Sequence, residues 1–575
     1  MRPDNPKIGG KTMKRAKFLA LLLASLLTLS TFTGCSGNDS SSSTEGSSSA
    51  AAETGGDESG TESSSTEAQA GEVSLPIVDE KITITWFADF DSNLTALVDN
   101  MSDTPFFQEL EEKTNIHIEF NHPAAGNETT AYNLLFASGD LPDMISHQNP
   151  GYPGGLDACI DDGYILDLTD LVPEYCPNYM AALEEFSSTY DENVMRSAYT
   201  GTGRIGAVGQ LMQEPQGPWA GLYVREDWLE ACNLDTPETF DDWEKMLTAF
   251  KDQMGATAPM LLFKNGYDNV FNNICMGFGV TPSWYLGEDG KVKFGPAEEG
   301  WREYVTKMND WYNKGLIDPD FMASTAAASI LPDTAMITTG KTGAFVGIYT
   351  NVAMWEAAIE GDKDSFIPVY TPMKTAGETH NFQSVILAGA SATMGLSISA
   401  DSEYAVECLR LFDYWFSEDG AMFCNWGDEG DTFEFDDNSE PVYTDKILAN
   451  PDGLSFAQAM AYFTMPPARP VYQDWTRELG SVPEKDIVCY DVWGQCTNSQ
   501  SIPAPASLNM DPNLFTEYST IMTDVQTAVD EATPQFISGV RSLDEYDAYL
   551  ETLRSFNIDR AVEIVQEAYD AFMAR

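Results

Sequence analysis

The chain has 575 residues, of which 43% are hydrophobic and 11% aromatic, so it is long enough and apolar enough to bury two sizeable cores. Its formal net charge of −59 repels phosphate backbones and anionic lipid headgroups, which argues against nucleic acid as a partner. Nine cysteines without a C-x-x-C pair and only four histidines form no zinc-binding pattern, and we expect neither a metal nor a cofactor.

Residues 1–34 have the pattern of a signal peptide, because basic residues precede an apolar run that is too short to cross a bilayer. The run ends in Thr-Phe-Thr-Gly-Cys35, which is similar to a lipobox, although Phe32 departs from the aliphatic residue expected there. We therefore expect a lipid such as palmitate on Cys35. Residues 35–72 are mainly Ser, Gly, Ala, Thr and acid, which predicts a disordered tether.

If Cys35 is lipidated, eight cysteines remain in the exported chain. Cys159 with Cys176, or Cys489 with Cys496, could form disulfides, and free buried thiols are the alternative.

Residues 82–145 show the pattern of a parallel sheet with crossover helices. The expected order is a strand over 82–86, a helix over 105–114, a strand over 116–120, a helix over 129–136 and a third strand that ends near residue 145. Ligands of such sheets lie beyond the carboxyl ends of the strands, which are here residues 86–93 and 146–149.

Residues 222–250, LYVREDWLEACNLDTPETFDDWEKMLTAF, predict a buried strand followed by two helices. The first helix should end at Asn233. The second should begin at a capping box formed by Thr239 and Asp242. Its apolar residues recur at i, i+3, i+4 and i+7, namely Trp243, Met246, Leu247 and Phe250.

The amino-acid sequence of the same stretch resembles that of the extracellular solute-binding lipoproteins of bacterial ABC importers, in the carbohydrate-uptake branch known as family 1. Three further segments are similar to motifs of that family: GDLPDMI at 139–145, ILDLT at 165–169 and WYNKGLIDPDF at 311–321. The resemblance covers about residues 81–573. It implies an α/β, two-lobe fold of the periplasmic-binding-protein type, class II, with a hinge between the lobes and a ligand cleft at their interface.

On this basis we assign residues 73–200 and 381–450 to lobe 1, and residues 201–380 and 451–575 to lobe 2. Gly340-Lys341-Thr342 is not a phosphate loop, because Ala335 occupies the position of the first Walker glycine, so energy for transport must come from a partner. We expect a strand over 345–349, a hairpin over 433–443 and two helices at the C-terminal end, the first opened by a capping box of Ser542 and Glu545.

A sugar site needs flat aromatic side chains for the C–H faces, and carboxylates or amides for the hydroxyl groups. Positions at strand ends and the family's placement of ligand contacts give eleven candidate ligand-binding residues, with packing as the alternative role for each. The candidates are Asp89, Asn93, His147, Gln148, Trp219, Trp284, Tyr285, Tyr349, Trp426, Asp428 and Trp493.

Asp89, Asp91 and Asn93 also have the spacing of the first half of a calcium loop. Leu94 stands where the loop needs glycine, so we do not expect calcium.

The resemblance implies a non-enzymatic, monomeric binding protein on the extracellular face of the cell membrane, attached through lipid on Cys35. Its expected partners are an oligosaccharide, the permease subunits of an ABC transporter and their separate ATPase. Two alternatives remain open: a surface-anchored glycoside hydrolase, and the same fold binding a peptide or another solute.

Overall fold

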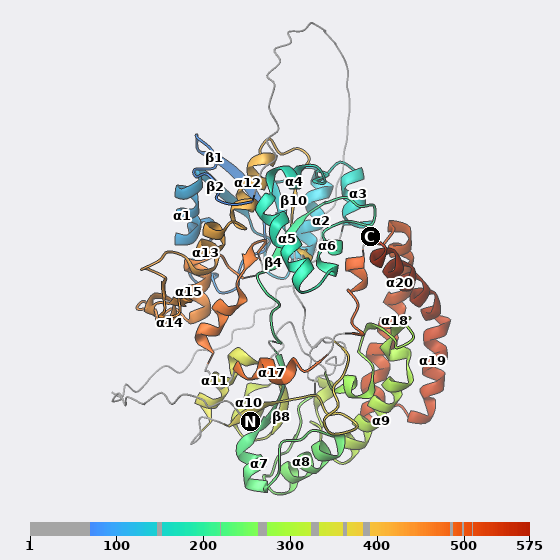
Figure 1. Cartoon of the computed structure of the whole chain (residues 1–575). Helices are drawn as coiled ribbons and strands as arrows, with labels where there is room; N and C mark the ends of the chain where they lie inside the picture. The colour runs from blue at the N-terminus through green and yellow to red at the C-terminus, as the bar shows by residue number, and fades with distance from the viewer. Residues whose placement is uncertain are drawn as a thin grey trace, which may run out of the picture. The chain divides into compact units, whose positions relative to one another are not determined.

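The computed structural model describes residues 70–146, 152–218, 220–262, 273–323, 333–359, 365–382, 391–467, 469–482, 487–496, 499–508 and 510–575. A six-stranded sheet organises one part of the molecule (Figure 1). Its strands, in spatial order, are β13 (Tyr472–Gln473), β4 (Val208–Met212), β10 (Ser391–Ile398), β3 (Met144–Ser146), β1 (Ile82–Phe87) and β2 (Ile116–Asn121).

β1, β2 and β3, the first three strands in chain order, form the βαβαβ unit that the sequence predicts. β1 is parallel to both β2 and β3, with Ile82 opposite Ile116 and Trp86 opposite Met144. The connecting helices are α1 (Pro105–Thr114) and α2 (Glu128–Ser138). The hydroxyl of Thr104 caps α1 by accepting the N–H of Phe107, and Pro105 occupies the first helical turn, where no N–H is needed.

A hydrophobic core lies on this sheet and includes Ile84, Trp86, Ile118, Leu396 and Trp415. Further helices, several of which pack into it, are α3 (Gly155–Asp161), α4 (Leu171–Tyr175), α5 (Pro177–Thr189), α6 (Asn193–Ser197), α12 (Ala405–Tyr414), α13 (Glu418–Trp426), α14 (Asp445–Leu448) and α15 (Phe456–Phe463).

A second, three-stranded sheet has the order β8 (Ala344–Ile348), β5 (Ala220–Arg225), β9 (Phe366–Val369), with antiparallel pairing throughout. The predicted strand and two helices of residues 222–250 are confirmed as β5, α7 (Glu226–Cys232) and α8 (Phe240–Asp252). Asn233 ends α7 in the left-handed conformation, and Thr239 and Asp242 form the capping box. The strand expected after Gly340-Lys341-Thr342 is β8.

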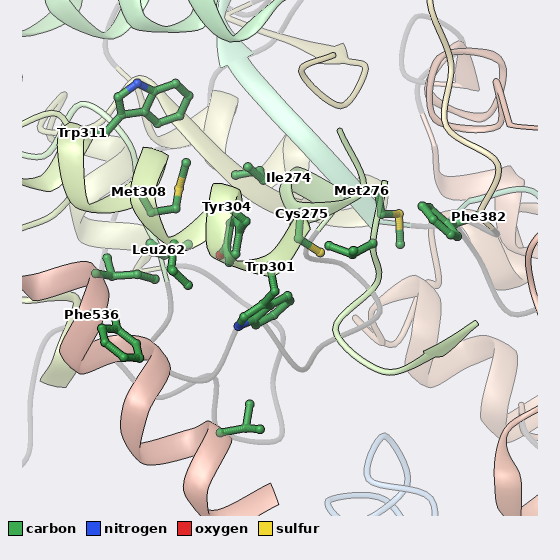
Figure 2. Packing of buried hydrophobic residues seen from close by; sticks show 14 of the residues in the cluster. Leu262, Ile274, Cys275, Met276, Trp301, Tyr304, Met308, Trp311, Phe382 and Phe536 are labelled. Atoms are coloured by element: carbon green, nitrogen blue, oxygen red, sulfur yellow. The ribbon is translucent and has the colours of Figure 1, made fainter. Parts of the chain in front are cut away.

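The largest core packs beside this second sheet. Along α9 (Glu299–Asn313), Trp301, Tyr304, Met308 and Trp311 are fully buried on one face, and Phe536 of α18 (Pro512–Ser538) joins the same cluster (Figure 2). The other helices of this part of the chain are α10 (Thr334–Thr338), α11 (Tyr349–Ala358), α17 (Cys489–Trp493), α19 (Tyr546–Ser555) and α20 (Ile558–Met573).

Two small hairpins complete the strands of the described residues. β6 (Trp284–Leu286) pairs with β7 (Val292–Phe294), and β11 (Phe433–Phe435) pairs with β12 (Pro441–Tyr443), as the sequence predicts for the second pair. Short 3₁₀ helices cover Met101–Asp103, Asn273–Phe278, Gly295–Ala297, Phe321–Ala323, Trp475–Ser481, Pro505–Leu508 and Leu543–Glu545.

The C-terminal region differs from the expectation in two ways. α18 precedes the two predicted helices, and Figure 1 shows it beside α20. Ser542 does not open α19 directly, because its hydroxyl accepts the N–H of Asp544 and caps the short 3₁₀ helix Leu543–Glu545 first.

In chain order, β4 of the six-stranded sheet is followed by β5 of the three-stranded sheet, and β9 of the three-stranded sheet is followed by β10 of the six-stranded one. After β13, the helix α17 packs against β5 and β9. β4 and β13 lie within residues 201–380 and 451–575, which the sequence predicts to be lobe 2. Both strands belong to the same six-stranded sheet as β1. The lobe boundaries given above stay predictions. The eight described cysteines from Cys159 to Cys496 form no disulfide.

Candidate functional site

The carboxyl end of β1 carries two of the candidate ligand residues, Asp89 and Asn93. The backbone N–H and the side-chain amide of Asn93 both donate to Oδ1 of Asp91, at 2.8 and 3.0 Å. The backbone carbonyl of Asp89 accepts a hydrogen bond of 2.7 Å from Nη2 of Arg469. Burial lowers the pKa of the Arg469 guanidinium, whereas the nearby carboxylates of Asp91 and Asp89 act to raise it. This edge is therefore an acidic turn held against a buried cation.

His122 supports the same edge and was not predicted. Its Nδ1 lies 2.8 Å from the carbonyl oxygen of Ala88, and its Nε2 accepts the N–H of Met101. Burial lowers the pKa of His122, which favours the neutral ring with the proton on Nδ1. The ring stacks on Phe120, two residues earlier on β2, so strand alternation was a signal that could have found it.

Four of the predicted site residues cannot be placed. Cys35, His147, Gln148 and Trp219 lie outside the described residues.

The five other aromatic candidates are buried and between 1% and 8% exposed. They belong to three different hydrophobic clusters, so the structure does not gather them in one place. Each has packing partners: Trp284 donates to Tyr518, Tyr285 packs on Phe382, Tyr349 packs on Tyr490, Trp426 donates to Asp474, and Trp493 donates to the carbonyl of Leu222. These contacts account for their burial, and a ligand-binding role for them stays a prediction.

Asp428 lies just after α13, at the start of the turn that leads into β11. Its carboxylate lies 3.4 Å from Nζ of Lys113 on α1, and its backbone N–H donates to the hydroxyl of Thr432. Asp428 therefore joins this turn to α1.

No cluster of three or more His, Cys, Asp or Glu side chains suited to a metal ion occurs in the ranges that the structure describes. None of the helices there has a stretch both long and apolar enough to span a membrane.

A pocket of about 420 Å³ lies between the segment that leads into α3 and the first turns of α18. The wall from α18 consists largely of hydroxyl side chains, and Tyr152 and Phe515 contribute aromatic rings. The lining residues are Tyr152, Pro153, Gly154, Gly155, Leu156, Asp157, Thr200, Gly201, Met510, Phe515, Thr516, Ser519, Thr520 and Thr523.

Hydrogen bonds fix the base of the pocket. Oδ1 of Asp157 accepts from the hydroxyl groups of Thr200 and Thr202 at 2.7 and 2.5 Å and from Nε of Arg204 at 3.0 Å. Burial would raise the pKa of Asp157, but these hydroxyl and guanidinium contacts outweigh it, and the pKa lies below its usual value. The carboxylate is thus charged and already bound by protein donors.

None of the residues that line this pocket was a candidate from the sequence. One signal was available on α18, because Thr516, Ser519, Thr520 and Thr523 have the spacing i, i+3, i+4 and i+7 of a single helical face. The pocket has the chemistry of a polyol site, with hydroxyl groups on one wall and aromatic rings beside them.

The model of the family "Bacterial extracellular solute-binding protein" matches residues 88–422. This is more than half of the chain, and the chain belongs to that family. The family and the fold class predicted from the sequence are thereby confirmed.

Individual relatives agree with this assignment. The fructooligosaccharide ABC transporter substrate-binding protein FusA of Streptococcus pneumoniae serotype 4 is 27% identical over 228 residues, which cover 37% of this chain and 41% of FusA. Lipoprotein LipO of Bacillus subtilis is 22% identical over 380 residues, or 63% of this chain and 70% of LipO. The sequence match therefore spans less than half the length of FusA.

The fold extends further than the sequence match. The solved structure of S. pneumoniae FusA in complex with kestose has a TM-score of 0.66 at 20% identity, and the superposition covers 86% of this chain and 100% of that one. At this level of identity the similarity concerns the fold.

Proposed function

We propose that this chain is the solute-binding component of an ABC importer and that it captures an extracellular oligosaccharide. The observation that carries the proposal is membership of the solute-binding family, joined to similarity with a relative whose name assigns it fructooligosaccharides. The hydroxyl-lined pocket beside α18 supports a sugar as the solute, because its wall complements a polyol.

The mechanism is closure of the two lobes over the sugar. A ligand shifts an open–closed equilibrium only through contacts that it makes in the closed state, so residues from both lobes must touch it. We place the pocket beside α18 and the acidic edge at Asp89 and Asn93 among these contacts. His147, Gln148, Trp219 and the buried aromatic candidates stay as predicted ligand residues.

The same proposal assigns no catalytic step to the chain. It acts as a monomer and hands the intact sugar to permease subunits, whose separate ATPase supplies the energy. The family's members are binding proteins, which supports capture over hydrolysis.

We further infer that the chain is held at the extracellular face of the membrane by lipid on Cys35. The test is expression in a bacterial host with metabolic labelling by palmitate. The full-length protein should carry label and sediment with membranes, whereas Cys35→Ser should be unlabelled and soluble. Equal labelling of both forms would contradict the lipid site without affecting the binding proposal.

Thermal unfolding with a panel of oligosaccharides tests the binding proposal, using a soluble form of the protein that starts at Val73. A sugar at a hundred times its Kd should add about 2.7 kcal/mol of stability, which gives a clear rise in Tm. Chromatography of the same samples follows the fate of the sugar. A raised Tm with intact sugar is expected, and a sugar that is consumed would favour the glycoside hydrolase instead.

A further inference from the structure

The pocket beside α18 has a distinctive charge pattern. The described lining residues include one charged side chain, Asp157, and none of them is Lys or Arg. This chain carries 90 acidic and 31 basic residues, so the surrounding field is negative as well. The described part of the lining therefore offers a ligand no Lys or Arg to balance an anionic group.

Three hydroxyl groups of the lining, those of Thr200, Thr520 and Thr523, donate their protons to the protein. Oγ1 of Thr520 donates to the carbonyl of Thr516 at 2.9 Å, and Oγ1 of Thr523 donates to the carbonyl of Ser519 at 2.8 Å. Oγ1 of Thr200 likewise gives its proton to Asp157. Since a hydroxyl group has one proton, these three oxygens present only lone pairs to a ligand.

The two cations that act on Asp157, Arg204 and Arg575, are both engaged by the protein. Arg204 forms ion pairs with Asp157 and Asp161, each at 2.8 Å. Arg575 donates to the backbone carbonyls of Tyr199 and Leu508 at 3.3 and 3.2 Å. Neither side chain lines the pocket, and recruiting either one to a ligand would break these contacts.

Sugar hydroxyl groups can donate to such a wall, whereas carboxylate and sulfate oxygens only accept. An anionic group facing Thr520 and Thr523 would place acceptor against acceptor and would lose hydration without a donor from these two side chains. The partly exposed rings of Tyr152 and Phe515 offer a stacking surface that does not depend on ligand charge.

We propose that this pocket is a subsite for a neutral sugar unit and that it discriminates against uronic-acid and sulfated units. The inference rests on the proposed function, because it names the class of oligosaccharide that the binding protein takes. Its specificity comes from the hydroxyl oxygens of Thr520 and Thr523, which can only accept hydrogen bonds from a ligand. It also comes from the absence of Lys and Arg among the described lining residues.

Titration calorimetry tests this with kestose and maltotriose as neutral probes and trigalacturonate as the acidic probe of the same length. Thr520→Val with Thr523→Val removes two acceptors while keeping the side-chain shape, and should weaken binding of the neutral probe about tenfold. Thr527→Val is the matched control. It lies on the same helix and makes the same hydrogen bond to the carbonyl four residues earlier, but does not line the pocket.

A second variant should gain affinity for the acidic probe, so the test does not depend only on a loss of binding. Thr520→Lys adds a cation to the wall and should improve binding of trigalacturonate relative to the neutral probes. The Tm of each unliganded variant should match that of the wild type, which separates binding from folding.

The outcomes are distinguishable. Neutral binding that the double variant leaves unchanged would overturn this subsite and leave the proposed function standing. Trigalacturonate bound as tightly as the neutral probes by the wild type would overturn the specificity. Failure of a broad oligosaccharide panel to bind at all would overturn the proposed function itself.

Discussion

His380 is a buried base whose environment makes stability depend on pH. Its ring stacks on Tyr370 at 5.3 Å between ring centres, and its Nδ1 accepts the backbone N–H of Phe382. Burial lowers the pKa of His380 to about 4. Below pH 6.5 the unfolded chain takes up a proton that the folded chain refuses, so this residue's contribution to stability falls as pH falls from 6.5 to 4.

We predict that His380→Asn, which retains an acceptor for Phe382, lowers stability at pH 7 but flattens part of the pH dependence. Because the pKa shift corresponds to about 3 kcal/mol, the stability difference between wild type and variant should shrink by about 2 to 3 kcal/mol between pH 7 and pH 4. Urea unfolding at several pH values measures this difference. Parallel curves for the two proteins would show that His380 titrates normally.

Residue type alone does not decide whether an aromatic side chain binds a ligand or packs in a core. Tryptophan and tyrosine suit both a sugar face and a hydrophobic core, and only the fold decides between them. Trp493, for example, ends a short helix and covers β5, a contact set by residues about 270 positions earlier in the chain. The proposed role of Thr520 and Thr523 depends on which segment faces α18, and the sequence does not show this.

The contact between α17 and β5 shows how closely two elements approach in this fold. A side chain at Gly221 would place its Cβ 2.4 Å from the Trp493 ring, so β5 needs glycine there. We predict that Gly221→Ala costs about 1 to 3 kcal/mol of stability through overpacking.

The same substitution should cost much less when Trp493 is already Leu, because the ring that clashes with the new methyl group is absent. Denaturant unfolding of both single variants and the double variant gives this coupling. Additive losses of stability in the double variant would show that the Trp493 ring does not clash with a side chain at residue 221. Sugar affinity measured on Trp493→Leu also tests the predicted ligand role of that residue.

Elements with strong local signals were predictable, and α18 was not. α7 and α8 have an αL residue, a capping box and regular apolar spacing, and β1 and β2 have clear alternation. α18 instead is rich in threonine and contains Pro534, both of which favour other structures in isolation. Its apolar face, including Val525, Val529, Ala532 and Phe536, is stabilised by packing into the core with α9.

At the scale of the whole molecule, the family resemblance predicted the fold. It did not predict which strands pair with each other, and the lobe boundaries depend on that pairing. β4 and β13 are short strands from distant parts of the chain, and they meet at the edge of the six-stranded sheet. No local pattern specifies that pairing, because a two-residue strand such as β13 carries almost no periodic signal. The pocket beside α18 has the same origin in long-range contacts.

The most direct test of the account is titration calorimetry of the soluble form that starts at Val73, with the oligosaccharide that raises its Tm most, followed by mass spectrometry of the recovered sugar. We predict one sugar per chain, a negative heat-capacity change from apolar burial, and recovered sugar of unchanged mass. Sugar recovered in shortened form, or no binding heat with any oligosaccharide of the panel across several temperatures, would contradict the central claim that this chain captures an oligosaccharide intact.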